Sequence, residues 1–233
     1  MNHIDHTSTV LRYLRQKTDS VILFYSAGGK DSLVLLDLCS KYFAQVHCVY
    51  MYFIPGLEHN AKYLAHVAKY KNTTLHQYPH FGTSHLLWAN DLTFTLESEN
   101  CRIKLEDIVQ KARRDTGAQW CIFGWKKADS IYRKVILETY KFDSISENTQ
   151  KAYPLSLWKK QQVSDYITVK SLPRPLAYGG KNSQGMGLSE DFLVWLRKFH
   201  PSDLEKMIKT FPLTGKTLFE YDYRQQNTPV TEV

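Results

Sequence analysis

The sequence predicts an α/β protein with a doubly wound, mostly parallel five-stranded sheet, helices on both faces of the sheet, and a small C-terminal helical appendage. Two observations support this fold. Apolar runs of strand length alternate with segments of helical periodicity through most of the chain. The first run, residues 21–25, is apolar at every position, as a strand covered by helices on both faces requires. The 233 residues, 43% of them hydrophobic, suffice for one full core.

The expected elements follow in chain order. A helix over residues 4–16 carries Val10, Leu11 and Leu14 at helical spacing. After the strand at 21–25 we expect a helix at 33–42, a strand at 46–53, a helix at 57–70, a strand at 73–78, a helix at 105–116 and a strand at 118–123. Later helices are expected at 159–169, at 189–200 and from Ser202 onward. In a sheet of this kind ligands bind at the carboxyl ends of the strands.

The regular alternation loosens after residue 140. We therefore expect an α/β domain over residues 1–170 and a loop and helical extension over residues 171–233 that packs on it. Pro173 and Pro175 end the helix at 159–169. Residues 177–187 hold four of the eleven glycines and form either a mobile loop over the site or a plain surface linker.

The cysteines and histidines predict no metal centre. Cys39, Cys48, Cys101 and Cys121 include no CxxC pair, which argues against a zinc site, an iron–sulfur cluster or a disulfide framework. The spacing of His76, His80 and His85 matches no zinc motif. No apolar run approaches the roughly 18 residues of a membrane span. We therefore expect a soluble, cytoplasmic protein that makes no membrane contact.

The chain is basic, with a formal net charge of +7 and an isoelectric point near 9.1. Such a surface attracts polyanions, and both nucleotide phosphates and nucleic acid qualify. The basic residues are spread along the chain and form no tail. The charge alone does not choose between these partners.

The segment after the first strand is the most informative part of the sequence. It comes directly after a buried strand and directly before a helix, and it reads Ser26, Ala27, Gly28, Gly29, Lys30, Asp31 and Ser32. The two glycines permit backbone angles closed to other residues, so main-chain N–H groups can converge on phosphate oxygens. The helix that follows adds its unpaired N–H groups and its dipole. The sequence therefore predicts a phosphate cradle here.

The spacing excludes two common phosphate motifs. A Walker A loop needs four residues between its first glycine and Gly-Lys-Ser/Thr, and the dinucleotide fingerprint needs GxGxxG. The pattern SxGGKDS instead resembles the PP-loop of N-type ATP pyrophosphatases and sulfonucleotide reductases. The chance alternative is a Gly-Gly turn that only joins a strand to a helix.

Three later stretches resemble the phosphoadenosine phosphosulfate (PAPS) reductase family in the same order. Gly56-Leu57-Glu58 is similar to the family's Thr-Gly and acidic segment beside the nucleotide. The stretch from Gly124 and Trp125 to Arg133 is similar to Gly-x-Arg-Arg-x-x-Ser-x-x-Arg. Residues 153–158 resemble its Pro-Leu-x-x-Trp element. The resemblance covers about residues 20–167.

The resemblance implies which residues contact an adenine nucleotide. Main-chain groups near Tyr50, Met51 and Tyr52 would read the adenine edge. Two cations after the fourth strand, Lys126 and Lys127, together with Arg133, would neutralise phosphate or sulfate across from the cradle. The two lysines could instead form a solvated basic turn. Trp120 and Trp125 suit either core packing or purine stacking.

The resemblance fails where reduction chemistry would need it. Sulfonucleotide reductases carry a Glu-Cys-Gly-x-His element whose cysteine attacks the sulfonucleotide sulfur, and here no cysteine follows Cys121. Without a thiolate that route lacks its nucleophile. The family's iron–sulfur cysteine pairs are missing as well, so we expect no cluster.

We therefore predict an enzyme that cleaves ATP at the α-phosphate and adenylates an acceptor, with Lys30, Lys126 and Arg133 stabilising the transition-state charge. Asp31 either helps to hold Mg²⁺ or caps the helix. The sequence leaves open whether the bound nucleotide is ATP, AMP or PAPS. The acceptor is unknown, nucleic acid is one candidate, and a homodimer is not excluded. Two alternatives remain: a sulfonucleotide reductase or sulfotransfer enzyme, and a nucleotide-binding regulator without catalysis.

Overall fold

The computed structural model describes residues 2–83, 103–178, 181–182 and 188–227. Its helices are α1 His3–Lys17, α2 Lys30–Tyr42, α3 Glu58–Val67, α5 Leu105–Thr116, the 3₁₀ turn η2 Lys127–Asp129, α6 Ile131–Glu138, α7 Lys160–Val169, α8 Glu190–Phe199, α9 Pro201–Thr210 and α10 Leu213–Asn227. Its strands are β1 Ser20–Tyr25, β2 Gln45–Tyr52, β3 Thr73–Pro79, β4 Cys121–Ile122, β5 Ile145–Ser146, β6 Lys151–Ala152, β7 Ala177–Tyr178 and β8 Lys181–Asn182.

The main sheet confirms the predicted α/β class, with one correction to the strand count. Its order is β3-β2-β1-β4-β6-β5, so the described sheet has six strands and not five. The pairs β3–β2, β2–β1, β1–β4 and β4–β6 are parallel, whereas β5 runs antiparallel to β6. Ranges were predicted for only four strands, and the other two, β5 and β6, are each two residues long. Strands that short show no periodicity that the sequence could reveal.

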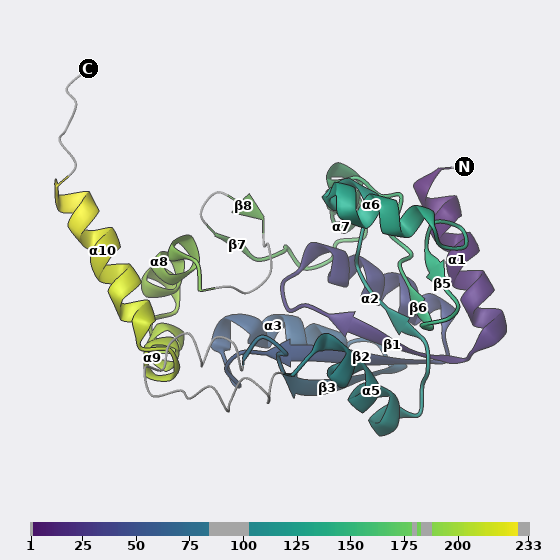
Figure 1. Cartoon of the computed structure of the whole chain (residues 1–233), viewed down its shortest axis with the longest axis horizontal. Helices are drawn as coiled ribbons and strands as arrows, with labels where there is room; N and C mark the ends of the chain where they lie inside the picture. The colour runs from purple at the N-terminus through teal and green to yellow at the C-terminus, as the bar shows by residue number, and fades with distance from the viewer. Residues whose placement is uncertain (1, 84–102, 179–180, 183–187, 228–233) are drawn as a thin grey trace, which may run out of the picture.

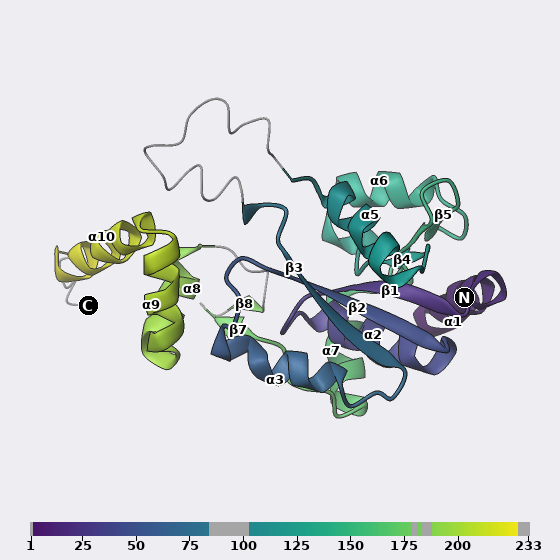
Figure 2. The same ribbon diagram turned by 90° about the horizontal axis from the view of Figure 1, so that it is seen from below.

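The alternation of side chains along β1 explains why helices cover both faces of the sheet. Val21, Leu23 and Tyr25 belong to a core cluster with residues of α1, α2, α3 and α7. Ile22 and Phe24 point to the other face and pack in a second cluster with residues of α5 and α6. Figures 1 and 2 show the same division, with α2 and α5 on opposite sides of the sheet. An apolar strand buried on both faces is therefore what the sequence predicted and what the structure contains.

The strand order reverses direction at β1. From β1 the chain adds β2 and then β3 on one side, and later returns to place β4 on the other side. The loops that leave β1 and β4 at their carboxyl ends therefore separate at this point. In open α/β sheets such a topological switch point is where ligands bind.

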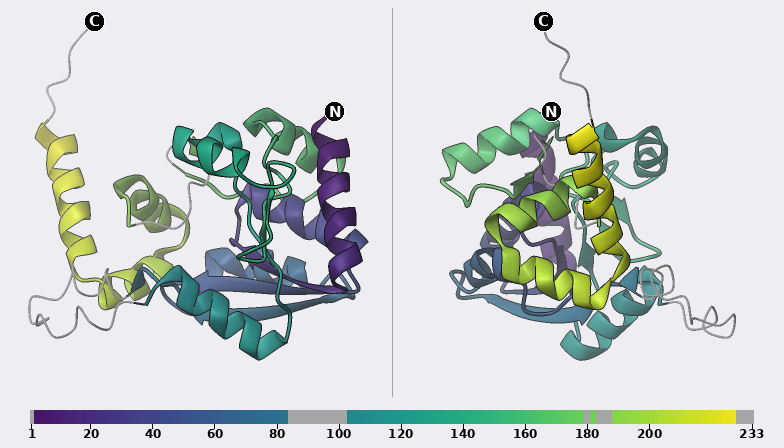
Figure 3. Two further views of the ribbon diagram at one scale, coloured as in Figure 1. Left: turned by 45° about the vertical axis from the view of Figure 1, so that its right-hand side comes forward. Right: turned by 90° about the vertical axis from the view of Figure 1, so that its left-hand side faces the viewer.

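Helices α8, α9 and α10 form the C-terminal appendage, at the end of the molecule where α3 begins (Figures 1 and 3). Their buried residues Phe192, Leu193, Leu204 and Met207 join the same core cluster as α2 and α3. The sequence predicted two helices here, and α10 is a third. Residues 179–180 and 183–187, within the predicted glycine-rich loop, lie outside the described residues. Among the described residues, no helix is both long enough and apolar enough to cross a bilayer.

Candidate active site

The loop between β1 and α2 has the geometry that its two glycines predict. Gly28 has a φ of 71°, in the left-handed region that a residue with a side chain rarely adopts. A Cβ on Gly29 would lie 3.0 Å from the Cβ of Ser26. The Ser26 N–H donates to the Ser32 hydroxyl at 2.9 Å, and the Gly29 N–H donates to the Ser26 carbonyl at 3.0 Å. The loop is thus a defined turn closed by its own residues.

Gly28 packs against two segments that are distant from it in the sequence. A Cβ there would lie 2.8 Å from the Cβ of Leu176 and 3.0 Å from the ring of Tyr63 in α3. The Leu176 N–H donates to the Gly28 carbonyl at 2.9 Å, and the Tyr63 hydroxyl donates to the Arg174 carbonyl at 2.9 Å. Any side chain at position 28 would therefore displace either the segment around Leu176 or α3. The sequence offered no signal for these two contacts.

The amino end of α2 has no side-chain cap. Its N-cap is Gly29, which has no side chain to act as a cap, and no other side chain of the described residues is seen to accept from the first-turn N–H groups. Asp31 stands in the first turn but does not cap the helix, so the capping alternative for Asp31 is wrong. Uncapped N–H groups at a helix start, with the positive end of the dipole, form a ready binding position for an anion. The predicted phosphate cradle thus has open donors.

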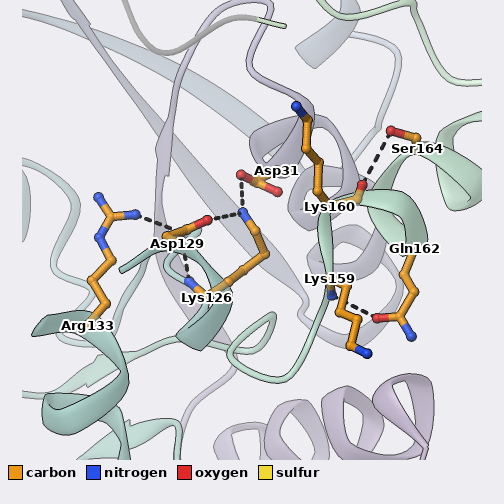
Figure 4. A network of polar contacts seen from close by, with 8 residues as sticks. All are labelled: Asp31, Lys126, Asp129, Arg133, Lys159, Lys160, Gln162 and Ser164. Carbon is orange, nitrogen blue, oxygen red and sulfur yellow. Dashed lines mark hydrogen bonds and ion pairs between the residues drawn. The ribbon is translucent and has the colours of Figure 1, made fainter. Parts of the chain in front are cut away.

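Four charged side chains meet across the switch point (Figure 4). The ammonium of Lys126, just after β4, donates to Asp31 Oδ2 at 2.6 Å and lies 3.2 Å from Asp129 Oδ1. Arg133 Nη1 donates to Asp129 Oδ2 at 2.7 Å. Lys126 is only 2% exposed, so its charge requires these carboxylate partners. Three of the four predicted catalytic residues are thereby joined into one network.

Close packing sets this network against the loop. Gly124 leaves β4 beside the first turn of α2, and a Cβ at Gly124 would lie 3.0 Å from the Cβ of Asp31. The missing side chain is what allows the segment after β4 to approach α2. Trp125 follows, and the Arg133 guanidinium lies 4.9 Å from its ring centroid, a cation–π distance. Trp120, by contrast, is buried in the core, where only its packing role remains.

Lys30, the fourth predicted catalytic residue, lies at the start of α2. Burial is the largest cause that lowers the pKa of Lys30 below its ordinary value, and the ammonium groups of Lys126 and Lys160 lower it further, while Asp31 opposes them. Several cations are therefore gathered at this edge of the sheet. An incoming anion would relieve their repulsion.

One oxygen at this site lacks a partner. Asp31 Oδ1 is buried and has no hydrogen bond within the described part of the chain. An unpaired carboxylate oxygen beside an anion site suits a bound cation. Mg²⁺ commonly uses one or two carboxylates together with substrate phosphates. Asp31 therefore fits the predicted role in holding Mg²⁺, with the nucleotide supplying the other oxygens.

Three predicted contact residues are not brought to this network. The ammonium of Lys127 lies 2.9 Å from Asp143 and 3.3 Å from Glu138, so its ion pairs are separate from those of Lys126. Gly56 and Glu58 lie at the start of α3, on the next helix along the sheet edge. Glu58 is exposed, and the Gly56 carbonyl accepts from Lys206 at 3.0 Å.

The residues predicted to read adenine lie at the carboxyl end of β2. Tyr50 pairs with Tyr25, the last residue of β1. Met51 and Tyr52 continue the strand and pair with β3, beyond the end of β1. Their main chain therefore lies next to the loop after β1. That it reads the adenine edge stays a prediction.

The described thiols are inert. Cys39, Cys48 and Cys121 are buried. Burial raises the pKa of Cys48 to about 12 and that of Cys121 to about 11, and burial also raises the pKa of Cys39. A thiol held neutral is a poor nucleophile. Cys101 and His85 lie outside the described residues. Within that same part of the chain, no group of three or more His, Cys, Asp or Glu residues could hold a metal ion.

Comparison with known proteins identifies the family of this chain and solved structures of similar fold. The family model for the phosphoadenosine phosphosulfate reductase domain matches residues 21–181. The chain is also similar to a solved structure, the NH3-dependent NAD synthetase from Campylobacter jejuni subsp. jejuni NCTC 11168, determined in complex with the nitrate ion. The TM-score is 0.48 at 11% sequence identity, and the match covers 100% of both chains. A search of the curated proteins found no match.

Proposed function

We propose a function for this chain, which belongs to the phosphoadenosine phosphosulfate reductase domain family: it cleaves ATP between the α- and β-phosphates and transfers AMP to an acceptor. One observation supports this most. The uncapped start of α2 faces a lysine–carboxylate network supplied by the segment after β4. Donors on two sides of one position suit a polyphosphate whose charge shifts during reaction.

The reaction would proceed by displacement at the α-phosphorus. The acceptor's nucleophilic atom forms a bond to that phosphorus, and the bond to the oxygen bridging the α- and β-phosphates breaks. Pyrophosphate leaves with that electron pair, and the acceptor's proton passes to solvent or to a base on the acceptor. Main-chain N–H groups of the loop and Lys30 would hold the departing pyrophosphate.

In this reaction Lys126 and Arg133 would stabilise the negative charge that develops on the α-phosphate. Both are already fixed by Asp129, so little reorganisation is required when charge develops on the α-phosphate. Mg²⁺, held by Asp31 and the phosphates, would supply further charge neutralisation. The acceptor would approach from the exposed side of the loop, where Ser26 lies.

The thiol chemistry does not favour sulfonucleotide reduction. The three described cysteines are buried and their thiols are held protonated. No cysteine follows Cys121 in the 233 residues. A reductase that works through an attacking thiolate would need one near the loop.

The test is a product assay with ATP labelled at the α-phosphate. With water alone we expect AMP and pyrophosphate in equal amounts, formed slowly. With the true acceptor we expect faster release of pyrophosphate and transfer of the labelled α-phosphate to the acceptor. Transfer RNA and DNA are the first acceptors to add. Lys30→Ala should lower the rate at least tenfold, since it removes a charge-assisted contact to phosphate. Lys127→Ala is the matched control, because its ammonium is paired with Asp143 and Glu138. Release of ADP and phosphate would contradict the proposal. Tight ATP binding without any cleavage would favour a regulator, and formation of sulfite from PAPS would favour a reductase.

A further inference from the structure

Helix α7 begins beside the candidate site, although the sequence predicted only its extent. Just before it, Trp158 is 1% exposed, and its indole N–H donates to the Thr7 hydroxyl at 2.8 Å. Within α7, the Tyr166 hydroxyl donates to Asp37 Oδ2 of α2 at 2.6 Å. Val163 is fully buried in the core that α2 shares. These contacts hold the first turn of α7 at a constant position against α2.

Two adjacent lysines at the start of α7 point in different directions (Figure 4). The side chain of Lys160 runs alongside the first turn of α2, on the side where Asp31 lies. The side chain of Lys159 points away from that turn, and its main-chain N–H donates to Gln162 at 2.8 Å. Both lysines are exposed. Of these two lysines, only Lys160 therefore adds its positive charge to the site.

The lysines around the loop differ in whether a carboxylate forms an ion pair with them. Lys126 is paired with Asp31 and Asp129. In the part of the chain that the structure describes, no carboxylate pairs with the ammonium of Lys30 or of Lys160. These two groups are close enough for Lys160 to lower the pKa of Lys30. Like charges held together by a rigid helix pair cost energy unless an anion lies between them.

We propose that Lys160 is a phosphate-binding residue that contacts the polyphosphate chain of the nucleotide beyond the reach of the loop, and so makes the site selective for a triphosphate over a monophosphate. The inference rests on the proposed function, because it assumes that a nucleotide occupies the loop. The loop and the α2 start supply donors from one side, and Lys160 supplies a cation from α7. A monophosphate held at the α-phosphate position would leave Lys160 without its partner.

The experiment is calorimetric titration of the full chain with ATP, pyrophosphate and AMP, using wild type, Lys160→Gln, Lys160→Arg and Lys159→Gln. Lys160→Gln should weaken ATP and pyrophosphate binding about tenfold, the loss expected for one charge-assisted hydrogen bond, and change AMP binding less than about twofold. Lys160→Arg should restore most of the ATP affinity, because it keeps the charge. Lys159→Gln should match wild type.

The outcomes separate this inference from the proposed function. If wild type binds ATP while Lys160→Gln binds it equally well, or loses AMP affinity to the same extent as ATP affinity, the role of Lys160 is wrong and the nucleotide site stands. An equal loss in Lys159→Gln would also overturn it, since a general effect of surface charge would then explain the result. If wild type binds none of the three compounds, both proposals fall. Because Lys160 is exposed, the substitution should leave the unfolding temperature unchanged, which thermal denaturation checks.

Discussion

Two helices, α2 and α3, start at the same edge of the sheet. They differ in whether a side-chain carboxylate accepts hydrogen bonds from the N–H groups of the first turn. Helix α2 follows β1; its N-cap Gly29 offers no side chain, and within the described ranges no distant side chain accepts from its first-turn N–H groups. Helix α3 follows β2, and Asp203 of α9 accepts from the Glu58 N–H at 2.8 Å and from the His59 N–H at 2.9 Å. The Asp203 carboxylate also contacts His59 Nδ1 at 2.7 Å. The fold thus supplies its own anion at α3 and leaves the position at α2 open.

The comparison shows why a helix start is not by itself a ligand site. Both segments present a glycine in the left-handed region, Gly28 with a φ of 71° and Gly56 with a φ of 69°. Both are followed by an acidic residue in the first helical turn, Asp31 or Glu58. The difference lies in a residue 145 positions away, which satisfies one helix and not the other. An anion site is present where the fold leaves the donors unsatisfied.

The largest expected effect comes from filling the loop at α2. Gly28→Val should abolish measurable ATP binding, because the new Cβ would lie 2.8 Å from Leu176 and the residue would need a positive φ. Gly56→Ala is the matched control: it has a positive φ but no atom within 4 Å of its Cβ. It should cost about 1–2 kcal/mol of stability and keep ATP affinity. Titration with ATP and urea denaturation measure both. Equal ATP affinity in wild type and Gly28→Val would mean that the loop after β1 does not bind ATP.

The next effect concerns the occupied helix start. Asp203→Ala should lower the free energy of unfolding by about 3 kcal/mol, since it removes a fully buried carboxylate that pairs with His59 and caps α3. Urea denaturation measures this change. In the folded fraction ATP affinity should change little, because the α2 start is separate from Asp203. A variant that loses ATP affinity more than stability would mean that the two helix starts are coupled.

The same carboxylate should make stability depend on pH. Burial alone would raise the pKa of Asp203, but hydrogen bonds from the main chain of His59 and Glu58 and from the His59 side chain outweigh it, so the pKa lies below its ordinary value. The stabilisation is therefore complete above the unfolded-state pKa, about 3.9, and is lost as the pH falls through the lower folded value. In denaturation series from pH 6 to pH 2, the free energy of unfolding of Asp203→Asn should fall less with decreasing pH than that of the wild type. An equal fall in both proteins would mean that other carboxylates cause most of the loss of stability in acid.

The smallest effect is expected at Glu58. Its side chain is exposed and its main-chain N–H already donates to Asp203. Glu58→Gln should change ATP affinity less than about twofold and stability by less than about 0.5 kcal/mol. Calorimetry and urea denaturation check both values. A tenfold loss of ATP affinity would instead support the nucleotide contact that the sequence predicted for Glu58, and the contrast between the two helix starts would be weaker.

Local patterns in the sequence predicted the main strands and helices and the place of the loop after β1 in the fold. Residues 21–32 read as strand, loop and helix start because burial and glycine placement are visible within a dozen positions. The segment from Gly124 to Arg133 was placed correctly because it follows a strand. Residues that act through distant contacts were not visible. Lys160, Leu176 and Asp203 lie far along the chain from the residues they approach, so only the folded sheet and helices bring them there. The two-residue strands β5 and β6 are defined by pairing alone.

A crystal structure with α,β-methylene ATP and Mg²⁺ would show whether the loop after β1 binds the triphosphate, because the methylene bridge blocks cleavage between the α- and β-phosphates. We expect phosphate oxygens within hydrogen-bond distance of main-chain N–H groups between Ser26 and Ser32, with the start of α3 still capped by Asp203. Nucleotide bound elsewhere, with the loop after β1 empty, would contradict it.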